Sequence, residues 1–128
     1  MDKFLAVIVE TLDGALTPAS LECVEEGREV ADRLGVRVRA ILCDRESSPL
    51  TETLAAHGAD AVTVVDHPAL AQFSADGWLQ ALAPVLRDLH PALLLAPDSG
   101  QARAWLPRLA ARWHLPLVGC CLRVGIVG

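Results

Sequence analysis

A polar turn after an apolar stretch is the first candidate site in this sequence. The apolar run Leu93–Ala96 is followed by Asp98, Ser99 and Gly100. In an open parallel sheet, ligands bind outside the carboxyl ends of the strands, and a glycine-containing turn there exposes backbone N–H groups. These three residues, with Arg103 just beyond them, are predicted to contact an anion or a partner protein. The alternative is that Ser99 or Asp98 merely caps the following helix.

The helix predicted after this turn carries large and basic side chains. Arginines gather between Arg103 and Arg112, which suits one small anion or an acidic partner. Trp105 and Trp113 lie on the same helix. If they are exposed, they favour a subunit interface at this place.

The histidines and cysteines form no pattern typical of catalysis or metal binding. The four histidines fall at predicted helix ends or turns, where capping or surface roles are expected: His57, His67, His90 and His114. The four cysteines lack C-x-x-C spacing: Cys23, Cys43, Cys120 and Cys121. They are predicted to be reduced and partly buried, and no metal site is predicted; a zinc site or redox pair is the alternative.

Sequence motifs for nucleotide binding and nucleophilic catalysis are missing as well. The chain contains no G-x-G-x-x-G, no G-x-x-x-x-G-K-[ST] and no G-x-S-x-G. It also lacks the glycine pattern of nucleotide-binding universal stress proteins. We therefore predict that the protein is not an enzyme and has no catalytic residues; a hydrolase acting through Asp98 or His67 is the remaining enzymatic alternative.

Apolar runs alternate with helical patterns along the chain. Short apolar runs bounded by turns predict buried strands: Phe4–Val9, Val36–Cys43, Ala61–Val65, Ala92–Ala96, and one or two strands within Leu117–Val127. Helices are predicted between successive strands. This order predicts an α/β fold, a three-layer doubly wound sheet of about five parallel strands with helices on both faces. Residues 1–128 are predicted to form a single domain.

Capping residues and prolines set the expected helix limits. The first helix is predicted to begin with Thr17 as N-cap, to end at Gly35, and to bury a face made by four residues: Leu21, Val24, Ala31 and Leu34. Ser48-Pro49 opens the second helix and Gly58 ends it. Ser74 caps the third, in which Pro84 predicts a kink or a late start. Pro107 predicts a split of the last helix, whose main part then starts near this proline.

Composition limits the classes of partner. Of 128 residues, 52% are hydrophobic and 21% charged, which indicates a folded chain. The net charge of −5 argues against a nucleic-acid surface. No apolar run reaches the roughly 18 residues of a membrane helix, and the first residues lack a signal-peptide core. A cytoplasmic protein without membrane insertion is expected.

Several strings, taken together with the order of elements, resemble the N-terminal domain of the electron-transfer flavoprotein alpha subunit. The matching strings extend over nearly the whole chain: Asp13-Gly14, Leu16 with Pro18, Gly58-Ala59-Asp60, Asp66 with Pro68-Ala69-Leu70, and Arg103 with Pro107-Arg108-Leu109-Ala110-Ala111-Arg112. The last string is the most specific.

The resemblance implies a fold related to the adenine-nucleotide alpha-hydrolase group and a non-catalytic module in a flavin-dependent electron-transfer system. It implies pairing with a beta-type subunit, or with a separate FAD-binding domain. In that family FAD is held mainly by a C-terminal domain that has no counterpart in these 128 residues. The chain alone is therefore not expected to hold a cofactor firmly, while FAD is expected in the full assembly. The alternative is a small adenine-nucleotide-binding protein of the universal-stress-protein-like class, using the turns after the first and fourth strands.

Overall fold

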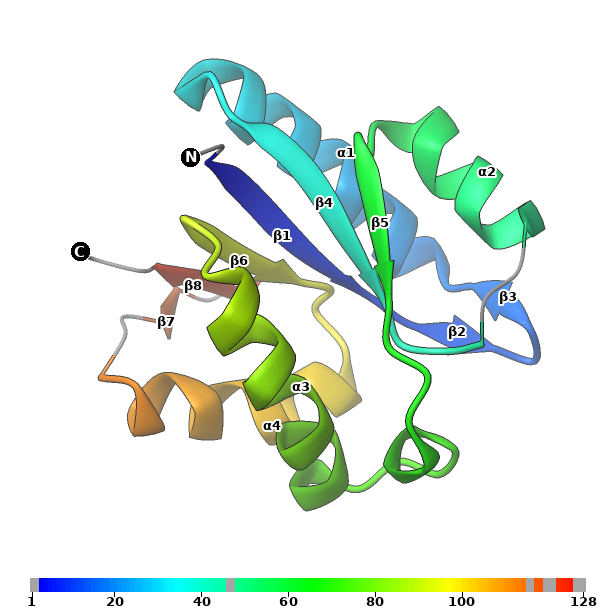
Figure 1. Ribbon diagram of the computed structural model, residues 1–128, viewed down its shortest axis with the longest axis vertical. Helices are drawn as coiled ribbons and strands as arrows, with labels where there is room; N and C mark the ends of the chain where they lie inside the picture. The colour runs from blue at the N-terminus through cyan, green and yellow to red at the C-terminus, as the bar shows by residue number, and fades with distance from the viewer. Residues whose placement is uncertain (1–2, 46–47, 115–116, 119–121, 126–128) are drawn as a thin grey trace.

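A computed structural model describes residues 3–45, 48–114, 117–118 and 122–125, with side chains up to residue 114. Its main sheet has six strands in the order β5-β4-β1-β6-β8-β7 (Figure 1). These strands are β1 (Phe4–Val9), β4 (Arg37–Leu42), β5 (Ala61–Val64), β6 (Leu93–Ala96), β7 (Leu117–Val118) and β8 (Leu122–Gly125). A separate hairpin is formed by β2 (Thr11–Leu12) and β3 (Ala15–Leu16). The helices are α1 (Pro18–Leu34), α2 (Ser48–His57), the 3-10 turn η1 (Pro68–Leu70), α3 (Ala75–Leu89) and α4 (Gly100–Arg112).

The sheet is mainly parallel. Parallel ladders join β1 to β4, β1 to β6 and β4 to β5. β8 pairs antiparallel with both β6 and β7, so β7 points the same way as β6. β7 and β8 follow each other closely in the sequence, whereas parallel neighbours need a crossover of about a dozen residues, so these two strands pair antiparallel. The predicted three-layer α/β fold is confirmed, with a sheet that is mixed at one edge.

The sheet is buried on both faces, which explains the continuous apolar run of β1. Residues Leu5 to Val9 are all fully buried. Ala6 and Ile8 pack into a cluster with α3 and α4, while Leu5, Val7 and Val9 pack into a second cluster with α1 and α2. The two pairs of helices therefore cover opposite faces (Figure 1).

The buried face of α1 differs in part from the one predicted. Val24 and Ala31 are buried as expected, but Leu34 is 59% exposed. The buried face also includes Ser20, Cys23 and Gly27. A Cβ atom on Gly27 would lie 2.9 Å from Val7 Cγ2, so α1 packs closely on the sheet at this glycine. Small residues allow this close packing, and a helical pattern of large apolar residues does not include them.

The prolines inside the last two helices do not divide them. α4 runs from Gly100 to Arg112 through Pro107, so the predicted split is wrong. Buried residues on both sides of Pro107, Trp105 and Leu109 among them, pack in one cluster and offset the lost backbone hydrogen bond. α3 begins directly after its predicted cap Ser74 and continues through Pro84, so the late start is wrong too.

The strand order determines where a ligand or partner can enter. β4 and β5 lie on one side of β1, and β6 lies on the other. After β1 the chain adds β4 and then β5 on one side, and it next crosses to the other side of β1 to form β6. The switch point of the sheet therefore lies between β1 and β6. Crevices at the carboxyl ends of strands next to such a switch point are the usual binding places in this class of fold.

Candidate functional site

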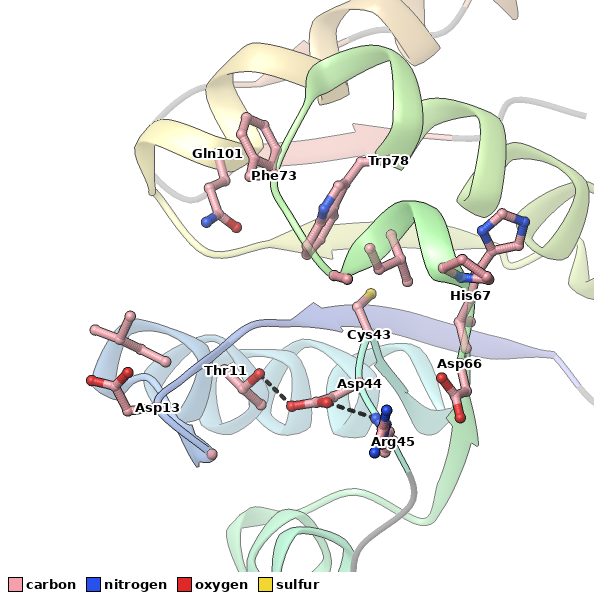
Figure 2. A pocket seen from close by; sticks show the side chains of 16 residues that line it. Thr11, Asp13, Cys43, Asp44, Arg45, Asp66, His67, Phe73, Trp78 and Gln101 are labelled. Carbon is pink, nitrogen blue, oxygen red and sulfur yellow. Dashed lines mark hydrogen bonds between the residues drawn. The ribbon is translucent and has the colours of Figure 1, made fainter.

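A pocket of about 660 Å³ lies at the carboxyl edge of the sheet (Figure 2). Small-molecule sites typically have roughly 300–1,000 Å³. The lining comes from the residues that follow β1, β4 and β5, from the segment before and within α3, and from the first turn of α4. It consists of Thr11, Leu12, Asp13, Gly14, Cys43, Asp44, Arg45, Val65, Asp66, His67, Pro68, Leu70, Ala71, Phe73, Trp78 and Gln101.

One wall of the pocket is polar and mostly acidic. Thr11 Oγ1 donates a hydrogen bond of 2.7 Å to Asp44 Oδ2, and the backbone N–H of Arg45 donates one of 2.7 Å to Asp44 Oδ1 (Figure 2). These bonds hold the Asp44 carboxylate between the ends of β1 and β4. Asp13 and Asp66 add two exposed carboxylates to the lining.

The opposite wall is apolar and aromatic. The rings of Phe73 and Trp78 lie 5.7 Å apart at 60° (Figure 2). Trp78 is only 5% exposed, and its buried indole N–H has no hydrogen-bond acceptor among the described residues. Buried polar groups without partners are uncommon, since each costs desolvation free energy. The wall thus contains an unsatisfied donor.

A buried carboxylate joins the two strands at the switch point. Glu10, directly after β1, is 5% exposed, and its backbone N–H donates to Ser20 Oγ at 2.8 Å. Ser99 Oγ donates to Glu10 Oε2 at 2.9 Å. Burial raises the pKa of Glu10, and the hydrogen bond from Ser99 partly opposes this by lowering it. The ends of β1 and β6 are therefore linked side chain to side chain.

The predicted turn residues lie at the start of α4, beside the pocket. Ser99 is the N-cap, and its Oγ accepts from the N–H of Ala102 at 3.0 Å, which confirms the capping role. Arg103 Nε donates to Asp98 Oδ1 at 2.7 Å, and this bond lowers the pKa of Asp98. Gly100 is exposed, with open space where a Cβ would lie. A contact of these four residues with an anion or a partner stays a prediction.

The two tryptophans of α4 have inward positions. Trp105 is fully buried, and Trp113 packs partly buried against the same cluster. Trp105 is therefore a core residue. Because it is not exposed, it does not support a subunit interface at this place. Its ring lies 6.3 Å from that of Trp78, so α4 supports the aromatic wall from behind.

The described histidines and cysteines have mainly structural surroundings. His67 Nδ1 accepts from the N–H of Ala69 and caps η1, and His57 Nδ1 lies 2.7 Å from Glu25 Oε1. Cys23 and Cys43 are buried; Cys120 and Cys121 lie outside the described residues. Burial, with smaller effects of Glu10 and Asp44, raises the pKa of the Cys43 thiol far above its ordinary value. The described residues contain no group of three or more His, Cys, Asp or Glu placed to hold a metal ion.

Most of the pocket was not predicted from the sequence. Glu10, Asp44, Asp66 and Trp78 are not among the site residues that the sequence predicts. Asp44 and Asp66 each come directly after a predicted strand, and Asp98 comes two residues after one, so the same signal applies to all three. The sequence gives no sign that Trp78 lines a pocket, because a tryptophan within a helix is equally typical of the hydrophobic core.

No helix in the described part of the chain has the length and apolar character that crossing a membrane requires.

Comparison with known proteins identifies the family. The model of the electron transfer flavoprotein domain matches residues 5–127. The electron transfer flavoprotein subunit alpha of Clostridium acetobutylicum is 33% identical, over 97% of this chain and 37% of that protein. The acryloyl-CoA reductase electron transfer subunit beta of Anaerotignum propionicum is 32% identical, over 94% of this chain and 33% of that protein. The lactate dehydrogenase (NAD(+),ferredoxin) subunit LctC of Acetobacterium woodii is 27% identical, over 91% and 28% respectively.

The chain thus spans roughly a third of the length of these relatives. The match nevertheless extends from the first parallel strand, β1, past the last described strand, β8. It includes every element that surrounds the pocket. The resemblance found in the residues and the family match agree, and the chain belongs to the electron transfer flavoprotein domain family, with similarity to its alpha subunits.

Proposed function

We propose that this chain is a non-catalytic module of a flavin-dependent electron-transfer system and that it pairs with a beta-type subunit. The observation that carries the proposal is the family match over residues 5–127. Relatives from Clostridium acetobutylicum and Anaerotignum propionicum are named as electron transfer subunits. Residues 1–128 act in this proposal as one domain, located in the cytoplasm, and its task is to position other parts of the assembly.

The pocket does not fit FAD. The pyrophosphate of FAD is anionic, and proteins bind such groups with helix N-termini, glycine-rich loops or basic side chains. Here the lining contributes Asp13, Asp44 and Asp66 against the single guanidinium of Arg45. We therefore propose that FAD is held by another domain or subunit of the assembly, and we assign no redox step to this chain.

The described side chains support a module without chemistry of its own. Burial raises the pKa of the Cys43 thiol and so disfavours the nucleophilic thiolate. Asp98 is engaged by Arg103, and His67 Nδ1 by the backbone of Ala69. These contacts engage one carboxylate oxygen of Asp98 and one ring nitrogen of His67, the two residues on which the hydrolase alternative depended.

The candidate turn belongs to the same proposal. Asp98, Ser99, Gly100 and Arg103 lie at the carboxyl edge next to Gln101, which lines the pocket. We propose that Gly100 and Arg103, which are both exposed, contact the partner, while Asp98 holds Arg103 and Ser99 caps α4. Arg103→Ala should then weaken the complex modestly, since an exposed charge at an interface rim contributes about 1 kcal/mol or less.

Binding to a beta-type subunit tests the proposal. The tagged chain and a beta-type subunit from the same genome are co-expressed, and the purified proteins are titrated against each other at micromolar concentrations. A stoichiometric complex is expected. An unrelated α/β domain of similar net charge, carrying the same tag, controls for nonspecific capture. If size-exclusion chromatography and calorimetry detect no complex, the proposal is wrong.

Calorimetry with AMP, ADP, ATP and FAD separates this proposal from the adenine-nucleotide-binding alternative. The position of the pocket at the strand ends favours a ligand site of some kind, but its carboxylates disfavour phosphates. No firm binding of any of the four compounds by the chain alone is expected. Tight AMP or ATP binding would favour the alternative, and firmly bound FAD would contradict the proposal.

A further inference from the structure

The pocket at the carboxyl edge combines negative charge with an apolar rim. Three of its side chains are carboxylates, Asp13, Asp44 and Asp66, and they outnumber the guanidinium of Arg45. Carboxylates that line one concave surface together attract a cation. The net charge of −5 adds to this field. A positively charged guest is favoured over an anionic one.

The rim exposes large apolar side chains. The large hydrophobic residues that are exposed in the described chain are Leu12 at 70%, Leu34 at 59% and Phe73 at 39%, and Leu12 and Phe73 both line the pocket. Leu12 belongs to the β2–β3 hairpin, while Phe73 precedes α3, so apolar surface is contributed from two separate segments. Apolar surface around a polar hollow is characteristic of protein–protein contacts.

The aromatic wall is incomplete by itself. Trp78 is buried, and its indole N–H lacks an acceptor in the described part of the protein. The neighbouring ring of Phe73 is partly exposed (Figure 2). Planar guanidinium groups stack on aromatic faces and donate hydrogen bonds in pairs to carboxylates. A guanidinium has donors only, so an arginine matches the carboxylates and the exposed Phe73 ring but does not satisfy the Trp78 N–H, whereas a lysine matches mainly the carboxylates.

We propose that this pocket is the docking site for an arginine-bearing loop of the beta-type subunit. The inference rests on the proposed pairing and adds its location and chemistry. The guanidinium lies between the Asp44 and Asp66 carboxylates and the Phe73 face, and apolar residues of the loop cover Leu12 and Phe73. Buried arginines that are surrounded by apolar contacts are common energetic centres of interfaces.

A matched pair of charge reversals tests the location. Asp66→Lys changes the pocket, and Glu29→Lys makes the same change on an exposed position in the second half of α1, away from the carboxyl edge. Calorimetric titration with the beta-type subunit should show roughly tenfold or more weaker binding for Asp66→Lys, and a change below about twofold for Glu29→Lys. Circular dichroism checks that both variants fold.

A second variant tests the apolar contact, and a salt series tests the electrostatic contribution. Phe73→Ala removes the exposed ring and should also weaken binding by about tenfold. Wild-type affinity should fall when NaCl rises from roughly 50 to 300 mM, and Asp66→Lys should flatten this dependence. If the wild-type complex forms but both variants bind within about twofold of it, the docking site lies elsewhere while the pairing stands. If no wild-type complex forms, the proposed pairing itself has failed.

Discussion

At the scale of single residues, the carboxyl edge depends on polar side chains that are distant in sequence. Ser99 and Glu10 are 89 positions apart, yet they share a hydrogen bond of 2.9 Å. Ser99 also caps α4, so one hydroxyl both starts a helix and satisfies a buried carboxylate. Removing it should cost more than removing an ordinary cap.

Ser99→Ala should lower the free energy of unfolding by about 2 kcal/mol, since it removes a helix cap and a hydrogen bond to a charged group. Ser74→Ala is the matched control, because Ser74 caps α3 by accepting from Gly77 N–H at 3.0 Å in an exposed position. It should cost about 1 kcal/mol. Urea unfolding measures both values. Equal losses would show that the contact with Glu10 contributes nothing.

Glu10 should make the protein less stable as the pH rises. Burial raises its pKa in the folded state above the ordinary value of 4.5, so the folded state binds more protons than the unfolded chain between these two values. Its contribution to stability is complete below that window and is lost as the pH rises through the folded pKa. Glu10→Gln keeps an acceptor for Ser99 but stays neutral.

The difference in unfolding free energy between Glu10→Gln and wild type should therefore shift in favour of the variant across this window and then level off. Urea unfolding at several pH values between about 4 and 8 measures it. Taking the difference removes the contributions of the other titrating groups, such as Asp60, whose pKa is lowered by a backbone hydrogen bond from Val38 and by Arg28. A constant difference would contradict the prediction.

At the scale of elements, the contact between α1 and the sheet depends on a glycine. A Cβ on Gly27 would lie 2.9 Å from Val7 Cγ2 and 3.2 Å from Leu5 Cδ2, and both of these residues are fully buried. With a larger residue there, either α1 or the side chains of Val7 and Leu5 must shift. The close approach of α1 is thus part of the packing that positions the end of β1.

Gly27→Ala should destabilise the protein by about 1–2 kcal/mol, because overpacking outweighs the gain of up to about 1 kcal/mol in helix propensity. Gly100→Ala is the control within another helix, since nothing lies within 4 Å of the added Cβ. That variant should be neutral or slightly stabilising. Thermal and urea unfolding provide the comparison, and a stabilised Gly27→Ala protein would show that α1 shifts at little cost.

A second link between elements explains one of the family strings. Arg28 of α1 donates to Asp60 Oδ2 at 2.8 Å and to the carbonyl of Gly58 at 3.1 Å. Asp60 also accepts from the N–H of Val38 at 2.8 Å. A Cβ on Gly58 would come within 3.0 Å of Arg28 Cβ. The Gly58-Ala59-Asp60 string therefore joins α1, α2 and two strands, which is a structural role.

At the scale of the whole molecule, stability is concentrated at the centre of the sheet. β1 is hydrogen-bonded on both sides, to β4 and β6, and covered by helices on both faces. β5 lies at one end of the strand order, and its residues are only partly buried. Local opening should therefore be easier at β5.

Hydrogen exchange should be slowest for the amides of β1 and at least about tenfold faster for those of β5, because opening an edge strand exposes less apolar surface than opening the centre. Exchange measured by NMR or mass spectrometry under native conditions resolves the two strands. Adding the beta-type subunit should slow exchange in β1 as well, because β1 opens only with the whole domain and binding to the folded state stabilises that state. Equal protection of β5 and β1 in the free chain would contradict this account.

The sequence by itself determined the order of elements and most of their limits. Thr17, Ser74 and Gly35 have the capping conformations that were predicted, and the continuous apolar run of β1 forms a strand buried on both faces. These features depend on neighbours within a few residues, so local patterns suffice to predict them. The strings shared with the family could be recognised for the same reason, since each consists of residues that are close together in the sequence.

Only the tertiary structure decided which of these residues meet. The order of the strands brings Thr11 and Asp44 within 2.7 Å, and it brings Ser99 to Glu10. It also placed Trp105 in the core and carried α4 through Pro107, because packing on the sheet outweighed a local breaker. Contacts between distant segments depend on where each crossover returns its strand, and no local pattern in a single sequence specifies that.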